Sequence, residues 1–115
     1  MPRDDRSALE QMLDTARRIG NLARGRTRDA LEGDEVAQLA LLHLIQRLGE
    51  AASRVSAYYR AEHSEFPWGE MVGMRNRIVH GYDDLDPDIV WRIVTEDVEP
   101  VVAALERALA NLGGS

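Results

Sequence analysis

Residues 34–60 read DEVAQLALLHLIQRLGEAASRVSAYYR, and the spacing of apolar residues in this stretch decides the fold. Apolar side chains recur every three or four residues, which is the period of an α-helix with one buried face. The main stripe consists of Leu41, Ile45, Leu48, Ala52, Val55 and Tyr59. Asp34 can accept a hydrogen bond from the first helical turn, so one long helix is predicted from Asp34 to about Arg60.

Two leucines in the first half of this stretch lie away from the main stripe. Leu39 and Leu42 make the helix apolar on more than one side, which predicts a second contact, such as another chain. Further along, Gly49, Ala51 and Ala52 have small side chains. They would let a neighbouring backbone approach this helix closely.

Helical spacing also precedes this stretch. A first helix is expected from Arg3 to about Arg24, and Gly25 ends the apolar pattern. Thr27 can cap a short helical turn that runs through Leu31. The N-terminal third of the chain therefore predicts one long helix followed by a short one.

Prolines mark the later helices. A third helix is expected over Pro67–His80, with Gly81 suited to a left-handed end. Asp86-Pro87 combines an N-cap with a first-turn proline and is expected to open the last helix. Pro100 is expected to kink that helix partway along.

No stretch alternates like a β-strand, so the sequence predicts an all-α fold. A chain of 115 residues is long enough for one core but not for two, which predicts a single domain over residues 1–115. Without cysteine, disulfide frameworks, thiolate nucleophiles and cysteine zinc sites are excluded. The longest mostly apolar run, Leu39–Ile45, is far short of the roughly 20 residues of a membrane span. No secretory signal is evident, so a cytoplasmic protein without membrane contact is expected.

The chain is acidic, with a formal net charge of −6. Such a surface repels polyanions, so RNA could bind only in a local cleft lined by arginine. Arg24, Arg26 and Arg28 form the one basic cluster. This cluster is either a rim for RNA or for a partner protein, or simply an exposed loop.

The densest polar constellation is MRNRIVHGY, residues 74–82, at the end of the third predicted helix. On an ideal helix, Asn76 and His80 lie four residues apart on the side opposite the apolar face. Arg75 lies beside the apolar face, about 140° from His80. The two side chains therefore converge on one ligand only through the reach of arginine or across a cleft between two subunits.

Arg75 and His80 together could cleave RNA without a metal ion. A histidine with a pKa of about 6.5 can move protons at neutral pH, and a guanidinium stabilises charge on a phosphate. The 2′-hydroxyl would attack its own phosphate while Arg75 stabilises the added negative charge. Tyr82 could add a hydroxyl or a stacking ring. The simpler alternative is that His80 is only a cation favoured at the negative end of a helix dipole.

The other polar and aromatic residues have structural explanations. His43 and His63 show no metal-ligand spacing, and the acidic run 83–88 lacks the glycine and closing glutamate of a calcium loop, so no metal site is expected. Glu50 could pair with Arg75 or with a second subunit but is interpreted as structural. The large aromatic residues are expected to anchor a core or an interface: Tyr58, Tyr59, Trp68 and Trp91.

Residues 75–82, RNRIVHGY, resemble the Arg-x4-His-x-Tyr motif of the HepT-like branch of HEPN domains. Further similarity lies in IQRLGEAA at 45–52, in PW followed by MVGM within 67–74, and in VWRIV at 90–94. Together these segments extend the resemblance from about Arg3 to Leu109. It implies an antiparallel HEPN bundle of four to five helices, a homodimer, and an endoribonuclease that needs neither metal nor cofactor.

The same resemblance implies partners and residue roles. Arg75 and His80 take the positions of the catalytic pair, and Asn76 that of the supporting polar residue. Tyr82 takes the position of a tyrosine that accepts AMP from an MntA-type nucleotidyltransferase antitoxin in a type VII toxin–antitoxin system, besides supporting the site. An attached anionic nucleotide would repel RNA and silence the enzyme. The homodimer would act alone or within a larger hetero-oligomer with the antitoxin.

Two other classes of function compete with the ribonuclease. The first is a non-catalytic HEPN module that binds a nucleotidyltransferase through the same face. The second is a purely structural helical dimer, for which the side chains of the motif would be dispensable.

Overall fold

The computed structural model describes residues 3–80 and 87–113, and no strand occurs in these two ranges. In chain order the elements are α1 (Arg3–Ala23), α2 (Arg28–Glu32), α3 (Glu35–Arg54), α4 (Ala57–Glu62), α5 (Trp68–His80), α6 (Pro87–Arg92), the π-helical segment η2 (Ile93–Asp97) and α7 (Val98–Gly113). The predicted all-α fold is confirmed.

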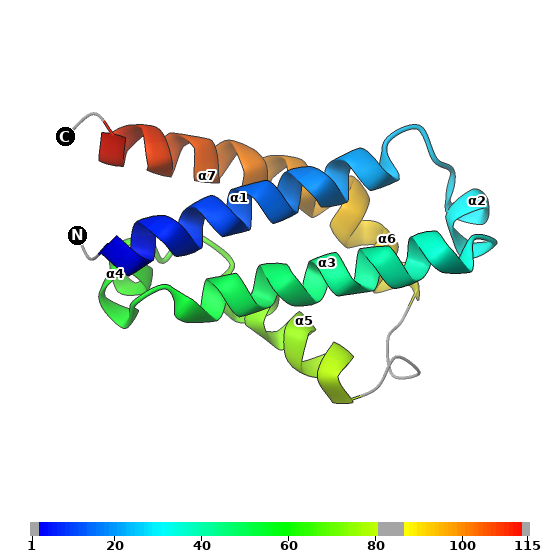
Figure 1. Ribbon diagram of the computed structural model, residues 1–115, viewed down its shortest axis with the longest axis horizontal. Coiled ribbons are helices and arrows are strands. Elements are labelled where there is room, and N and C mark those ends of the chain that lie inside the picture. Colours follow the sequence, from blue (N-terminus) through cyan, green and yellow to red (C-terminus); the bar gives the residue numbers. More distant parts are fainter. Residues whose placement is uncertain (1–2, 81–86, 114–115) are drawn as a thin grey trace.

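Three long helices form the body of the molecule, which measures 46 × 29 × 20 Å. Figure 1 shows α1 between α7 and α3 and antiparallel to both, while α5 crosses beneath α3. The buried apolar residues come mainly from these helices and include Leu9, Met12, Ile19, Leu41, Ile45, Val55, Val98 and Leu105. The whole stripe predicted for residues 34–60 is buried, because it faces α1 and α5.

The helix starts follow the predicted capping residues. The Thr27 hydroxyl accepts a hydrogen bond from the Ala30 N–H at 3.1 Å and begins α2. The Asp34 carboxylate accepts one from the Ala37 N–H at 3.0 Å and begins α3. This bond, helped by Arg26, lowers the pKa of Asp34 below its ordinary value. Both caps are therefore confirmed.

The long helix expected to run to Arg60 ends at Arg54 instead, and that prediction was wrong. Asp5 on α1 is 1% exposed and accepts hydrogen bonds from both the N–H and the hydroxyl of Ser56, each at 2.7 Å. The Ser56 hydroxyl in turn accepts from the Tyr59 N–H at 3.1 Å and caps α4. A buried carboxylate 51 residues away in sequence thus separates α3 from α4.

The last helix is also divided, although Pro100 was expected only to kink it. Its hydrogen-bond pattern changes to a π-helix over Ile93–Asp97, immediately before α7. Proline donates no N–H bond, and its ring crowds the carbonyl four residues earlier, here that of Glu96. The irregular segment therefore lies one turn before Pro100, and Figure 1 shows α6 turned away from the axis of α7.

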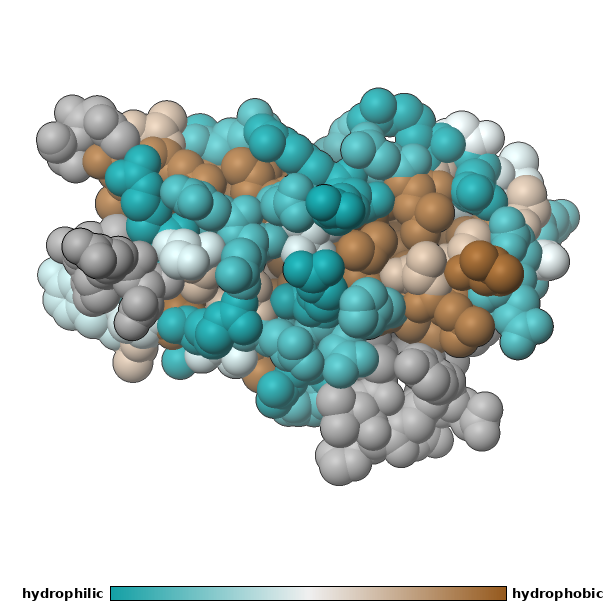
Figure 2. All heavy atoms as spheres, viewed as in Figure 1, coloured by the Kyte–Doolittle hydropathy of each residue, from teal (hydrophilic) through white to brown (hydrophobic). Residues whose placement is uncertain are grey.

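The first half of α3 carries an apolar face that no described residue covers. Val36 is 77% exposed and Leu39 is 49% exposed, whereas Leu42 is half-buried against the core. Figure 2 shows hydrophobic surface over this part of the molecule. A second contact for this face stays a prediction.

Candidate functional site

The candidate site is built where α5 crosses α3. A Cβ atom placed on Gly49 would lie 2.5 Å from the Met71 carbonyl oxygen and 2.6 Å from the Arg75 Cβ. Only glycine leaves room for this crossing. The close approach predicted at Gly49 is thus confirmed, and the neighbouring backbone is the one that carries Arg75.

The guanidinium of Arg75 has one hydrogen-bonded nitrogen and one buried nitrogen without a hydrogen-bond partner among the described residues. Its Nη2 donates a hydrogen bond to the exposed Asn76 side-chain oxygen at 2.8 Å. Its Nε is buried and has no hydrogen-bond partner among the residues that the structure describes. Because a buried unpaired N–H costs free energy, the site favours an acceptor at this nitrogen. Arg75 and Asn76, both predicted as site residues, are therefore brought together.

Glu50 lies beside Gly49 and was considered as an ion-pair partner of Arg75. It accepts a hydrogen bond from the Gln46 side chain at 3.3 Å, and no ion pair joins it to Arg75. The structural interpretation of Glu50 agrees with these contacts. Arg75 thus faces no carboxylate among the described residues.

His80 is the last residue of α5, as predicted. It follows Arg75 by five positions along the helix, which places the two positions about 7.5 Å apart along the axis and about 140° apart around it. The imidazole of His80 lies outside the described side chains. Tyr82 falls within residues 81–86, which lie outside the described part of the chain.

In the basic cluster of Arg24, Arg26 and Arg28, two of the three arginines form ion pairs within the chain. Arg26 pairs with Asp34 at 3.2 Å. Arg28 pairs with Glu32 at 2.8 Å and with Asp88, and hydrogen bonds to these two carboxylates raise its pKa. Two of the three arginines therefore tie the loop after α1 to its neighbours, which favours the structural interpretation over a rim for RNA.

The predicted aromatic anchors divide into buried and exposed residues. Tyr59 and Trp68 are buried, and the Trp68 ring meets Tyr59 edge to face with centroids 6.3 Å apart. Burial, helped by nearby carboxylates, raises the pKa of Tyr59. Trp91 is half-buried, and Tyr58, 72% exposed, does not belong to the core.

His63 also belongs to this aromatic cluster. Its ring stacks on Tyr59 at 4.0 Å. No group of three or more His, Asp or Glu suitable for a metal ion occurs within the described residues.

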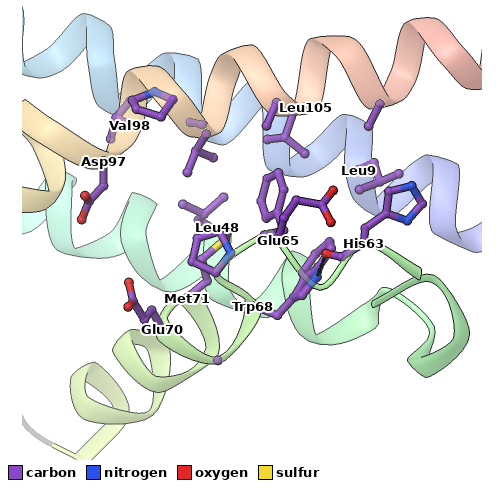
Figure 3. Close-up of a pocket in the computed structure, with 18 of the residues that line it drawn as sticks. Leu9, Leu48, His63, Glu65, Trp68, Glu70, Met71, Asp97, Val98 and Leu105 are labelled. Carbon is purple, nitrogen blue, oxygen red and sulfur yellow. Dashed lines mark hydrogen bonds between the residues drawn. The ribbon is translucent and has the colours of Figure 1, made fainter. Parts of the chain in front are cut away.

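A groove that the sequence did not reveal lies between α5 and α7 (Figure 3). Its volume is about 1100 Å³, and its walls come from α1, α3, the segment before α5, α5 itself, and η2 with α7. Trp68, Met71 and Val98 give it an apolar floor. The only sequence signal for it is the pair Gly69 and Gly73, four residues apart on α5.

Comparison with known proteins identifies the family. The sequence pattern of the family described as "Ribonuclease HepT-like" matches residues 12–108. The chain belongs to this family. The resemblance to HepT-like HEPN domains is therefore confirmed.

Relatives of this HepT-like chain extend over nearly its whole length. "Probable ribonuclease HepT" from Thermococcus cleftensis is 26% identical over 107 residues, covering 93% of this chain and 97% of the relative. "Putative RNase MJ1380" from Methanocaldococcus jannaschii is 27% identical over 104 residues, covering 90% of this chain and 95% of the relative. No solved structure matches the chain significantly.

The coarse functional class follows from these relatives. Their names describe ribonucleases, which supports a ribonuclease-like function for this HEPN chain. The matched span contains both Gly49 and the whole of α5. Among the described helices, none combines the length and apolar character needed to cross a bilayer.

Proposed function

We propose that this chain is a metal-independent endoribonuclease, the toxin of a type VII toxin–antitoxin pair. The observation that carries the proposal is the setting of Arg75, whose backbone packs on Gly49 and whose guanidinium is steadied by Asn76. This cation occupies the arginine position of the Arg-x4-His-x-Tyr motif, on a helix that ends at His80. Because the chain belongs to a family described as ribonucleases, a role for this motif in RNA cleavage is supported.

The reaction needs only proton transfer and charge stabilisation. The ribose 2′-oxygen forms a bond to the adjacent phosphorus, and the bond from phosphorus to the 5′-oxygen of the next nucleotide breaks. His80 moves the proton that leaves the 2′-hydroxyl or the one that reaches the leaving oxygen. Arg75 stabilises the extra negative charge on the phosphate oxygens. The products are a 2′,3′-cyclic phosphate and a free 5′-hydroxyl.

The proposed active form is a homodimer. The positions of Arg75 and His80 lie about 140° apart around an ideal helix, so the two positions of one copy do not share a face of α5. A cleft between two copies would bring an arginine and a histidine to one phosphate. We therefore expect RNA cleavage to require the homodimer.

The activity test is cleavage of a labelled RNA in EDTA by the wild type, Arg75→Ala and His80→Ala. We expect each variant to lose at least about a hundredfold in rate, the usual size of a lost general acid–base or charge-stabilising group. Arg47→Ala is a matched control, because Arg47 is exposed, lies outside the motif and outside the basic cluster, and forms no ion pair with any described residue. Cleavage by both motif variants at the wild-type rate would overturn the proposal.

The proposed partner is an MntA-type nucleotidyltransferase that transfers AMP to Tyr82. The test is the intact mass of the chain after co-expression with the nucleotidyltransferase encoded beside it, compared with Tyr82→Phe. Added AMP units on the wild type alone would support regulation at this residue. An unmodified chain that binds the transferase and cuts no RNA would favour the non-catalytic module.

A further inference from the structure

One side of α7 faces a groove along nearly its whole length. α7 packs along α1, but no extensive contact joins it to α5 among the described residues, so the groove separates α5 from α7. The residues of η2 and α7 that line the groove recur every three or four positions and span about 30 Å. They are Ile93, Asp97, Val101, Ala104, Ala108 and Leu112. Such a stripe is typical of a helix that packs against another helix on that side.

The lining of the groove is that of a core with one side uncovered. Its floor includes buried leucines from three different helices, Leu9, Leu48 and Leu105. Phe66 and Ile93 on its walls are only half-buried. A groove of about 1100 Å³ is large enough for a row of side chains from another element. Covering an apolar surface of this kind is favourable.

The walls of the groove indicate which kind of segment fits. They are mainly helices, whose backbone groups are hydrogen-bonded within each helix. An extended segment would leave its own backbone groups without partners against an apolar floor, which costs free energy. An α-helix satisfies those groups internally. The groove therefore favours an amphipathic helix as its occupant.

The α5 wall allows the occupant to approach closely. Gly69 and Gly73 lie four residues apart on α5, and both line the groove. A Cβ atom built on either glycine meets nothing within 4 Å. Gly49 differs, because a contact within the chain requires it. A helix in the groove could therefore lie directly against the backbone of α5.

The charges that line the groove are mixed, with three carboxylates and two guanidinium groups. They belong to Glu65, Glu70, Asp97, Arg92 and Arg107. None of the five forms an ion pair with any residue that the structure describes. The two arginines disfavour an occupant that is basic throughout, whereas the carboxylates favour a single cation near them.

Two of the carboxylates face each other near one end of the groove. Figure 3 shows Asp97 of η2 opposite Glu70 of α5. Asp97 is half-buried, and it is the one charged residue of the stripe on η2 and α7. A carboxylate in such surroundings is stabilised by a nearby cation. A basic side chain of the occupant would therefore be favoured between these two residues.

No described helix of a second copy offers a face of the required length. Among the described residues, the exposed large apolar side chains are Val36, Leu39 and Tyr58. The first two lie within one turn of α3, and Tyr58 belongs to the six-residue helix α4. A face of about 30 Å needs between five and six helical turns, or about 20 residues. The occupant is therefore expected to be a helix of a different protein.

We propose that the groove between α5 and α7 binds an amphipathic helix of a different protein, with a basic side chain of that helix between Glu70 and Asp97. The apolar face of the helix would cover the stripe on η2 and α7. The inference goes beyond the proposed ribonuclease, because neither Arg75 nor Asn76 lines the groove.

The test is binding of a labelled synthetic peptide to the full chain, measured by fluorescence anisotropy. The peptide is a helix of about 20 residues, with leucine and alanine on one face, glutamine on the other, and a single lysine near one end of the apolar face. A second peptide carries glutamate in place of the lysine. We expect the lysine peptide to bind with a Kd of about 10 μM or below, and the glutamate peptide at least about tenfold more weakly.

Variants of the groove identify the binding surface. Glu70→Arg/Asp97→Asn should reverse the preference, so that the glutamate peptide binds more tightly than the lysine peptide. Gly73→Leu should keep the helical circular dichroism, because its side chain enters open space, yet weaken both peptides at least about tenfold by occupying the groove. The control Val36→Gln/Leu39→Gln changes the exposed apolar residues of α3, outside the groove, and should leave binding unchanged.

Three results would overturn the inference. The first is a lysine peptide that does not bind at about 100 μM. The second is binding that neither Gly73→Leu nor the charge reversal changes. The third is a dimer, observed by sedimentation velocity, that Gly73→Leu dissociates, because a second copy would then occupy the groove.

The inference and the proposed ribonuclease can fail separately. Arg75→Ala should bind the lysine peptide as the wild type does, because Arg75 lies outside the groove. A chain that binds the peptide through the groove but cuts no RNA would support the inference and overturn the ribonuclease. A chain that cuts RNA through Arg75 but binds no peptide would do the reverse.

Discussion

Replacing Gly49 with alanine should damage both the fold and the candidate site. The new Cβ would lie 2.5 Å from the Met71 carbonyl oxygen and 2.6 Å from the Arg75 Cβ, whereas ordinary contacts begin at 3.4 Å. Since both neighbours belong to the backbone or its first side-chain atom, α5 must move by about 1 Å. Overpacking of this kind costs about 1–3 kcal/mol, and a rigid neighbour places the cost at the upper end.

The gain in helix propensity offsets part of this cost. Alanine is better than glycine in a helix interior by about 0.5–1 kcal/mol, which leaves a net loss of about 2 kcal/mol in the free energy of unfolding. For a domain of this size, the melting temperature should fall by about 6–10 °C. The displaced Arg75 should also slow RNA cleavage in the same variant.

Gly20→Ala is the matched control for this experiment. Its Cβ would lie 3.5 Å from the Val98 Cγ1, an ordinary contact, so only the propensity gain remains and stability should rise by about 0.5–1 kcal/mol. Thermal unfolding followed by circular dichroism at one protein concentration measures both variants. If Gly49→Ala unfolds at or above the temperature of Gly20→Ala, the crossing of α3 and α5 is not as tight as described here.

Three further predictions concern single contacts. Asn76→Ala should lower the rate of RNA cleavage about three- to tenfold by freeing the Arg75 guanidinium, while Asn76→Gln, which keeps a neutral amide acceptor, should retain more activity; equal rates for both variants would refute a positioning role. Asp5→Ala should lower the free energy of unfolding by about 2–4 kcal/mol, because it leaves the half-buried N–H and hydroxyl of Ser56 without their acceptor, and urea unfolding measures this loss. The pKa of Asp34 in the folded chain is lowered from 3.8, so the stability that its carboxylate contributes is present above pH 3.8 and is lost as the pH falls through the folded pKa. Asp34→Asn should therefore weaken the dependence of the melting temperature on pH below about 4. An unchanged dependence would contradict this.

The capped helix starts could be predicted from the sequence, whereas the end of α3 could not. A cap such as Thr27 or Asp34 acts within three residues of itself, so the signal is local. The end of α3 depends on Asp5, which reaches Ser56 from the first helix. No residue near Ser56 in the sequence indicates that contact. The periodic apolar pattern continues from Val55 to Tyr59, across the break between α3 and α4.

The same distinction applies to the candidate site. The sequence predicted correctly that Arg75 and Asn76 lie on one helix, and the small residues around Gly49 indicated a close approach. The identity of the approaching helix required the tertiary structure. The groove could not be predicted either, because its walls come from helices far apart in the chain and meet only after folding.

The ion pairs bear on how so acidic a chain could bind phosphate at the proposed site. Five arginines pair with carboxylates among the described residues: Arg6, Arg17, Arg18, Arg26 and Arg28. Arg75 forms no ion pair among the described residues; its Nη2 donates to the neutral amide of Asn76, and its buried Nε has no hydrogen-bond partner there. Within the described part of the chain, Asn76 thus holds this guanidinium in place without compensating its charge, in a molecule of net charge −6. Because five of the other arginines are paired, the phosphate site proposed at Arg75 is a local one and needs no broad basic face.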